Sequence, residues 1–128
     1  MILDSSAIVA ILLKESGHEG LSSKLASAPS LGIGTPTLLE TAIVLSARLE
    51  RNAQGILANL IQETETVVIP FSHAHCSAAH RAWLNYGKGR HPAALSFGDC
   101  AAYATARLAR EPLLCTGDDF ARTDLELA

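Results

Sequence analysis

Short apolar runs alternate with longer helical patterns along this chain, and that alternation restricts its fold more than any other feature. Residues 1–3 and 66–69 are apolar or β-branched runs too short to be helices, and a segment with helical spacing follows each. Strands that alternate with helices favour a parallel sheet covered by helices. We therefore predict an α/β fold, a single domain over residues 1–128 with a mainly parallel central sheet flanked by helices.

The expected strands are residues 1–3, 31–33, 66–69 and 113–115. The expected helices are residues 5–14, 18–28, 35–51, 53–64, 72–86 and 98–110. We expect Gly17 to close the first helix, and a turn over residues 116–118 to follow the last strand. Ligands of such sheets bind outside the carboxyl ends of the strands, so the functional site is expected at that edge.

Four acidic residues fall at this edge. Asp4 follows the first expected strand and Asp118 follows the last, while Glu40 and Asp99 lie near the starts of helices that begin there. Two carboxylates about 5 Å apart repel by roughly 3 kcal/mol at an effective dielectric constant of about 20. If the four acids converge, a divalent cation is therefore needed, and carboxylate oxygens without thiolates or imidazoles suit Mg²⁺, with Mn²⁺ as a substitute.

Each acid then has an expected role. Asp4 and Asp99 are predicted to bind the metal directly, and Glu40 and Asp118 to hold its water molecules or a second metal. Such a metal activates water for attack on a phosphodiester and stabilises charge on the phosphate.

Two hydroxyl-bearing residues lie close to these acids in the sequence. Ser6 and Thr116 are predicted to orient the carboxylates as hydrogen-bond donors. Capping of a helix or a turn is the alternative role for both of them.

The same acids also have purely structural interpretations. The segments Thr37-x-x-Glu40 and Ser96-x-x-Asp99 both match the capping-box pattern. The remaining two acids could cap the first helix and stabilise a turn. It is the shared edge of the sheet that favours a metal site over four separate caps.

The charge and hydropathy of the chain bear on its partners. The formal net charge is −3, and setting aside four negative charges for the metal site leaves +1, so acidity does not exclude a nucleic-acid ligand. Lys88 and Arg90 lie in a glycine-containing loop leading towards Asp99 and are candidate RNA contacts, the alternative being an ordinary solvated loop.

Two helices are more apolar than one buried face requires. Residues 7–13 and 38–49 could therefore cover a protein interface, or be buried on two sides.

Two features of the sequence concern the location of the protein in the cell. No apolar run approaches the roughly 20 residues of a membrane span. Residues 1–4 do not resemble a signal peptide, so we expect a cytoplasmic protein without membrane association.

Four segments resemble the motifs of one nuclease family. The segment MILDSSAIVA (1–10) resembles the opening strand and helix of PIN-domain nucleases. TLLETA (37–42) and LLCTGDDF (113–120) are similar to their second and fourth acidic motifs. YGKGRHPAALSFGDC (86–100) resembles the third motif of a bacterial subset, the VapC toxins. Their order and spacing fit along essentially the whole chain.

This resemblance implies a PIN domain and an Mg²⁺-dependent endoribonuclease that acts as the toxin of a type II toxin–antitoxin pair. It further implies an RNA substrate, a homodimer, and a cognate VapB-type antitoxin that lays a C-terminal segment over the apolar helices and into the site. In the fourth motif the Thr-x-Asp pattern favours Asp118 as the acid of the site and leaves Asp119 as a helix cap.

Two other functions remain open at this point. One is a catalytically degenerate PIN fold that only binds protein or RNA. The other is a phosphatase or phosphotransferase with Asp4 as nucleophile. Such enzymes usually carry a second aspartate two residues further on, where this chain has Ser6.

Overall fold

The computed structural model describes residues 1–128 and contains one sheet of parallel strands. The strands are β1 (Ile2–Leu3), β2 (Gly32–Gly34), β3 (Val67–Ile69) and β4 (Leu113–Leu114). Their order in the sheet is β3-β2-β1-β4. The predicted α/β fold with a parallel sheet is therefore confirmed.

Six α-helices and one short 3₁₀ helix surround this sheet. They are α1 (Ser5–Leu12), α2 (His18–Ser27), α3 (Thr35–Leu49), α4 (Gln54–Glu63), α5 (His73–Tyr86), α6 (Phe97–Ala109) and η1 (Phe120–Arg122). The predicted role of Gly17 is wrong. Helix α1 ends before Lys14, which already has a left-handed φ of 52°, and Gly17, with φ 86°, directly precedes α2.

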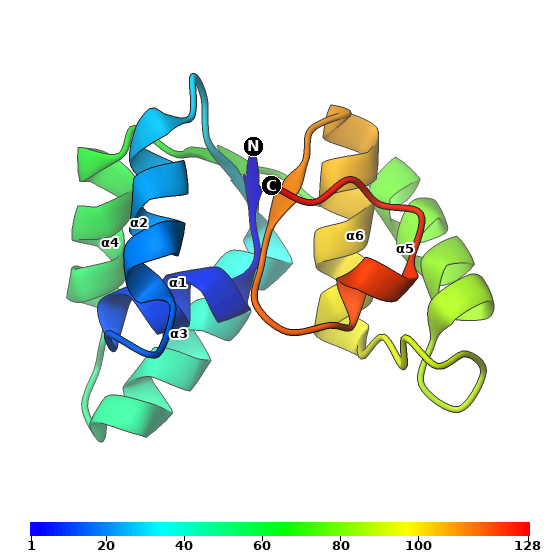
Figure 1. The fold of residues 1–128 in the computed structure, drawn as a ribbon, viewed down its shortest axis with the longest axis horizontal. Helices are drawn as coiled ribbons and strands as arrows, with labels where there is room; N and C mark the ends of the chain where they lie inside the picture. Colours follow the sequence, from blue (N-terminus) through cyan, green and yellow to red (C-terminus); the bar gives the residue numbers. More distant parts are fainter.

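The strand order determines which helices cover which face. The chain moves in one direction across the sheet from β1 to β2 to β3, and then returns past β1 to β4. Because such crossovers are right-handed, the helices of the first two connections share one face and those of the third lie on the other. Figure 1 shows this arrangement, with α1 to α4 on one side of the strands and α5 and α6 on the other.

The core has a part on each face of the sheet. In the paired strands β1 and β4, Ile2 and Leu113 pack with α6, whereas Leu3 and Leu114 pack with the helices of the opposite face. Helix α6 approaches the sheet closely, and a Cβ on Gly34 would lie 2.6 Å from Oγ1 of Thr105. Glycine at position 34 therefore lets α6 pack directly on β2.

The two unusually apolar helices have different surroundings. In α1, the run from Ala7 to Ala10 is buried, so its apolar residues belong to the core. In α3, Leu39 and Ile43 remain 62% and 60% exposed, one helical turn apart. None of the helices has both the length and the apolar character that a membrane crossing requires.

Candidate active site

The strand order reverses between β1 and β4, and at this position in open α/β sheets a ligand crevice forms. Asp4 comes directly after β1 and is the N-cap of α1. Its backbone N–H donates to the carbonyl of Leu114 in β4 at 3.0 Å. The two central strands therefore place the Asp4 carboxylate at the expected edge of the sheet.

A short hydrogen-bond chain fixes one oxygen of this carboxylate. Oδ2 of Asp4 accepts from the backbone N–H of Ser6 at 3.1 Å and from its hydroxyl at 2.5 Å. The Ser6 hydroxyl oxygen in turn accepts from the backbone N–H of Thr116 at 3.0 Å. Thr116 thus acts through its main chain, where the sequence had suggested its side chain.

The other oxygen of Asp4 has no hydrogen-bond partner. Asp4 is only 3% exposed, and Oδ1 is buried without a donor. Burial raises the pKa of Asp4 from 3.8 to about 6; the hydrogen bonds from Ser6 oppose this rise, and the charges of Asp99 and Glu40 add to it. A buried oxygen that lacks a donor and carries charge is costly, and a cation bound there would offset that cost.

Glu40 reaches the same region from α3. Its Oε1 accepts from the hydroxyl of Ser5 at 2.7 Å, and its carboxyl group lies against the backbone of Gly98 in α6. The predicted capping box of Thr37 with Glu40 is wrong, because α3 begins after Gly34 and the buried Thr37 hydroxyl has no partner.

Ser5 and Gly98 were not among the predicted site residues. Each adjoins a predicted metal-binding acid in the sequence, but only the packing of α1, α3 and α6 reveals their contacts with Glu40.

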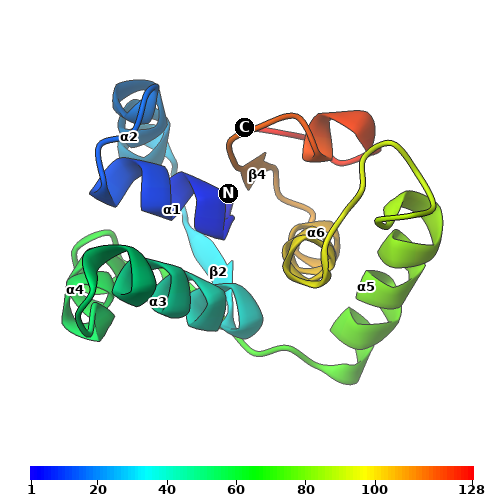
Figure 2. The same ribbon diagram turned by 90° about the horizontal axis from the view of Figure 1, so that it is seen from below.

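Asp99 caps its own helix and still lies close to Asp4. Its Oδ2 accepts from the backbone N–H of Ser96 at 2.9 Å, and its own N–H donates to the Ser96 hydroxyl at 3.2 Å, so the predicted capping box is present. The charge of Asp99 nevertheless contributes to the raised pKa of Asp4. In Figure 2, the N-terminal ends of α1, α3 and α6 lie around one central region. The charges of Asp99 and Glu40 both act on Asp4, so three of the four predicted acids influence one another.

The fourth acid lies on the exposed segment after β4. Both Asp118 and Asp119 are exposed, and Asp119 precedes η1 but makes no capping hydrogen bond with its side chain. Burial raises the pKa of the nearby Cys115 to about 11, and the charges of Asp4, Asp99 and Asp119 add to the shift. Because the Asp119 side chain makes no capping hydrogen bond, the structure does not provide the helix-cap role that was predicted for it.

The donor set fits a magnesium ion that keeps most of its water. No three carboxylate, imidazole or thiol groups of the chain are arranged as a cage for a metal ion. Mg²⁺ usually binds through one or two carboxylates, with water and substrate phosphate as its other ligands. The unpartnered Oδ1 of Asp4, with two further acids nearby, matches this preference.

The two candidate RNA contacts differ in their surroundings. The Arg90 guanidinium lies 4.9 Å from the ring centre of Trp83, and its Nε donates to the carbonyl of Leu84 at 3.1 Å. Lys88 lines an apolar groove of about 770 Å³ between α5 and α6, together with Phe97, which is 91% exposed. Arg90 is thus held against α5, whereas Lys88 borders an open groove.

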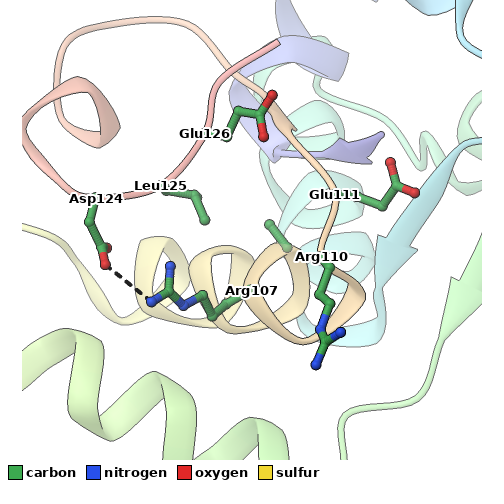
Figure 3. A pocket seen from close by; sticks show the side chains of 7 residues that line it. Arg107, Arg110, Glu111, Asp124, Leu125 and Glu126 are labelled. Atoms are coloured by element: carbon green, nitrogen blue, oxygen red, sulfur yellow. Dashed lines mark ion pairs between the residues drawn. The ribbon is translucent and has the colours of Figure 1, made fainter.

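Another pocket lies at the opposite end of α6. Figure 3 shows Arg107 directed towards Asp124, with Arg110 and Glu126 around the same pocket. The ion pair between Arg107 and Asp124 measures 3.3 Å. Arg107 lies eight positions after Asp99 along the helix, which corresponds to about 12 Å at 1.5 Å per residue. This pocket is therefore separate from Asp99 and the site around it.

Comparisons with known proteins agree with this fold. The sequence profile of the PIN domain family matches residues 1–126. Ribonuclease VapC36 of Mycobacterium tuberculosis is 48% identical over 127 residues, covering 98% of this chain and 91% of the relative.

Two solved structures share the fold at lower sequence identity. The sarcin–ricin loop cleaving toxin VapC20 of M. tuberculosis matches with a TM-score of 0.79 and 20% identity, covering 99% of this chain and 97% of the other. A toxin–antitoxin complex from Klebsiella pneumoniae matches with a TM-score of 0.73 and 19% identity, covering 99% and 95%. Similarity over the full length in sequence and in fold shows that this chain belongs to the PIN-domain family, as one of its VapC ribonucleases.

Proposed function

We propose that this protein is an Mg²⁺-dependent endoribonuclease with an active site formed by Asp4, Glu40, Asp99 and Asp118, and that it acts as the toxin of a cytoplasmic toxin–antitoxin pair. The observation that carries the proposal is the buried, unpartnered Oδ1 of Asp4, with the charges of Asp99 and Glu40 nearby. Without a cation this arrangement is unfavourable for the folded protein, so it is best explained by a function that needs it.

Each residue of the proposed site has its own role. Asp4 and Asp99 would hold Mg²⁺, which when bound activates water and stabilises negative charge on the scissile phosphate. Ser6 occupies Oδ2 of Asp4 and so leaves Oδ1 for the metal. Ser5 donates to Oε1 of Glu40, and Oε2, which lies against Gly98 without a hydrogen-bond donor, is the oxygen that would orient water or accept a proton.

The fourth acid extends this site towards the solvent. Asp118 is assigned from the Thr-x-Asp pattern, and its exposed position after β4 suits an acid that holds water at the rim. Asp119, whose charge acts on Cys115 at the same edge, is the alternative.

The competing functions have less support from the geometry. A phosphatase of this kind usually carries a second aspartate two residues after the nucleophile, and this chain has Ser6 there, with its hydroxyl bound to Asp4. A degenerate binding module has no need to retain a buried carboxylate beside two other acids.

The main test is metal-dependent RNA cleavage. Purified protein is expected to cut RNA internally with Mg²⁺ or Mn²⁺ and to stop when EDTA is added, because Asp4, Glu40 and Asp99 provide oxygen ligands for a hard cation. Cleavage of end-labelled RNA, resolved on denaturing gels, measures this. Undiminished cleavage in EDTA would contradict the metal proposal, and intact RNA under all metal conditions would favour the degenerate binding module.

The apolar surface of α3 is proposed as the antitoxin contact. Leu39 and Ile43 are exposed on α3. Leu39 also lines a groove of about 480 Å³ between α3 and α4, together with Leu57 and Ile61. Glu40 lies on the same helix, so a peptide seated on this surface reaches the acids within a few residues. For the homodimer we propose the second apolar surface, the α5–α6 groove beside the exposed Phe97.

Expression of the toxin alone is expected to arrest growth, and co-expression of the antitoxin, encoded by a short gene immediately upstream, is expected to relieve the arrest. The double variant Leu39→Asp with Ile43→Asp should still cleave RNA but lose this relief, because two charges would then face an apolar partner. Leu108→Asp, at an exposed position near the end of α6, is the matched control. Full relief of the double variant would place the antitoxin elsewhere, and harmless expression of the toxin alone would contradict the toxin role.

A further inference from the structure

Three helices contribute to the position of one carboxyl group in this site. The hydroxyl of Ser5, in the first turn of α1, donates to Oε1 of Glu40 at 2.7 Å. On its other side the Glu40 carboxyl group touches Gly98, the second residue of α6. Glu40 itself belongs to α3. Its side chain is therefore held between two helices other than its own.

Gly98 provides space that a larger residue would fill. A Cβ built at this position would collide first with Oε2 of Glu40 and would lie 2.9 Å from Cδ and 3.0 Å from Oε1, too close for the carboxyl group to stay in place. The atoms in the way belong to the end of a long side chain, so Glu40 would move and the backbone would not need to. The contact therefore affects where Glu40 points far more than whether α6 can form.

The two contacts also link Glu40 to the other acids. Ser5 directly follows Asp4 in the sequence, and Gly98 directly precedes Asp99. Glu40 is thus in contact with one sequence neighbour of Asp4 and one of Asp99, so the positions of the three acids depend on one another. We infer that Ser5 and Gly98 are positioning residues that hold the Glu40 carboxylate in the position, relative to Asp4 and Asp99, that metal binding requires. This inference rests on the proposed metal-dependent function.

Metal binding tests this without relying on activity. Mn²⁺ affinity can be measured by calorimetry for the wild type, Ser5→Ala, Ser5→Thr and Gly98→Ala, with RNA cleavage as a second readout. We expect Ser5→Ala and Gly98→Ala to weaken Mn²⁺ binding by about 10- to 100-fold, the usual effect of losing a group that orients a ligand. Ser5→Thr keeps the hydroxyl and should restore binding to near the wild-type value.

The chain offers a matched control for the glycine. Gly55 is the second residue of α4, as Gly98 is of α6, and a Cβ at Gly55 meets nothing within 4 Å. Gly55→Ala should leave Mn²⁺ affinity unchanged. If Gly98→Ala does not fold, the decision rests on Ser5→Ala, whose melting temperature in EDTA should stay close to that of the wild type.

A double-mutant cycle shows whether Ser5 acts through Glu40. Glu40→Gln alone should weaken Mn²⁺ binding, and adding Ser5→Ala to it should cause little further loss. Wild-type Mn²⁺ affinity in both Ser5→Ala and Gly98→Ala would overturn this inference and leave the proposed function intact. A wild-type protein that binds no Mn²⁺ would instead contradict the proposed function itself.

Discussion

Asp4→Asn is expected to remove RNA cleavage and, at the same time, to make the metal-free protein more stable. The amide keeps the shape of the carboxyl group and can still accept the hydrogen bonds from Ser6 at Oδ2. It cannot supply the charged oxygen that a cation needs, so activity should fall by more than the about 10- to 100-fold typical for loss of an orienting group. The stability gain comes from removing a buried charge that lies beside two others.

The pH dependence follows from the direction of the pKa shift. Burial raises the pKa of Asp4 from 3.8 to about 6, so between these values the folded protein binds a proton that the unfolded chain has already released. The contribution of Asp4 to stability is therefore fully present below about pH 4 and is lost as the pH rises through about 6. Above that pH the loss is about 3 kcal/mol, at 1.36 kcal/mol per pKa unit.

Unfolding in EDTA at several pH values measures this effect. At pH 7.5, Asp4→Asn should raise the melting temperature by roughly 5–15 °C, and the difference from the wild type should shrink towards pH 4. Adding Mg²⁺ should stabilise the wild type and leave Asp4→Asn unchanged. Glu63→Gln, at an exposed position at the end of α4, should change none of these values. A metal-free Asp4→Asn protein that is less stable than the wild type at pH 7.5 would contradict the electrostatic account.

Asp99→Asn is expected to lose activity to a similar degree while keeping the stability of the wild type within about 1 kcal/mol. The side-chain oxygen of asparagine can still accept from the backbone N–H of Ser96, so the capping box at the start of α6 survives. Only the negative charge near Asp4 is removed. A residue that served purely as a helix cap would tolerate this change, so the variant separates the two roles that the sequence left open.

Steady-state cleavage rates and denaturant unfolding measure the two properties independently. Glu19→Gln is the matched control, because Glu19 is also an acid in the first turn of a helix but lies in α2, outside the site. Near-normal cleavage by Asp99→Asn would remove Asp99 from the proposed metal ligands. The same assay on Asp118→Asn and Asp119→Asn shows which of the two supplies the fourth carboxylate.

Much of the fold was predictable because the signals were local. The short apolar runs predicted each strand to within one residue or two, and Ser96 with Asp99 predicted the cap of α6. The predictions failed where the same local pattern is compatible with two different sets of contacts. Thr37 and Glu40 matched a capping box, but α3 begins earlier, at Thr35, and packing turns Glu40 towards Ser5 and Gly98.

The sequence predicted that the acids lie at one edge of the sheet, but it did not predict their contacts or their burial. The parallel sheet places Asp4, Glu40 and Asp99 on the same side, since strands end and helices begin there. The buried, unpartnered Oδ1 of Asp4 depends on how the elements around it pack, which no sequence spacing specifies. The hydrogen bond from the Thr116 backbone N–H to the Ser6 hydroxyl could not be predicted either, because nearly every residue has a backbone N–H and the sequence does not indicate which one is used.

The pairing of β1 with β4 has a consequence for the order in which this nuclease is made. Asp4 is synthesised about 110 residues before its partners, because its backbone N–H donates to the carbonyl of Leu114 and its partner Ser6 accepts from the backbone N–H of Thr116. At about 5–20 residues per second, these partners are added roughly 5–20 s later. A chain still attached to the ribosome, with residues up to 110 complete, therefore lacks the strand that closes its site. An RNA-cutting centre assembled in this order is incomplete until β4 has been synthesised, while its messenger RNA is within reach.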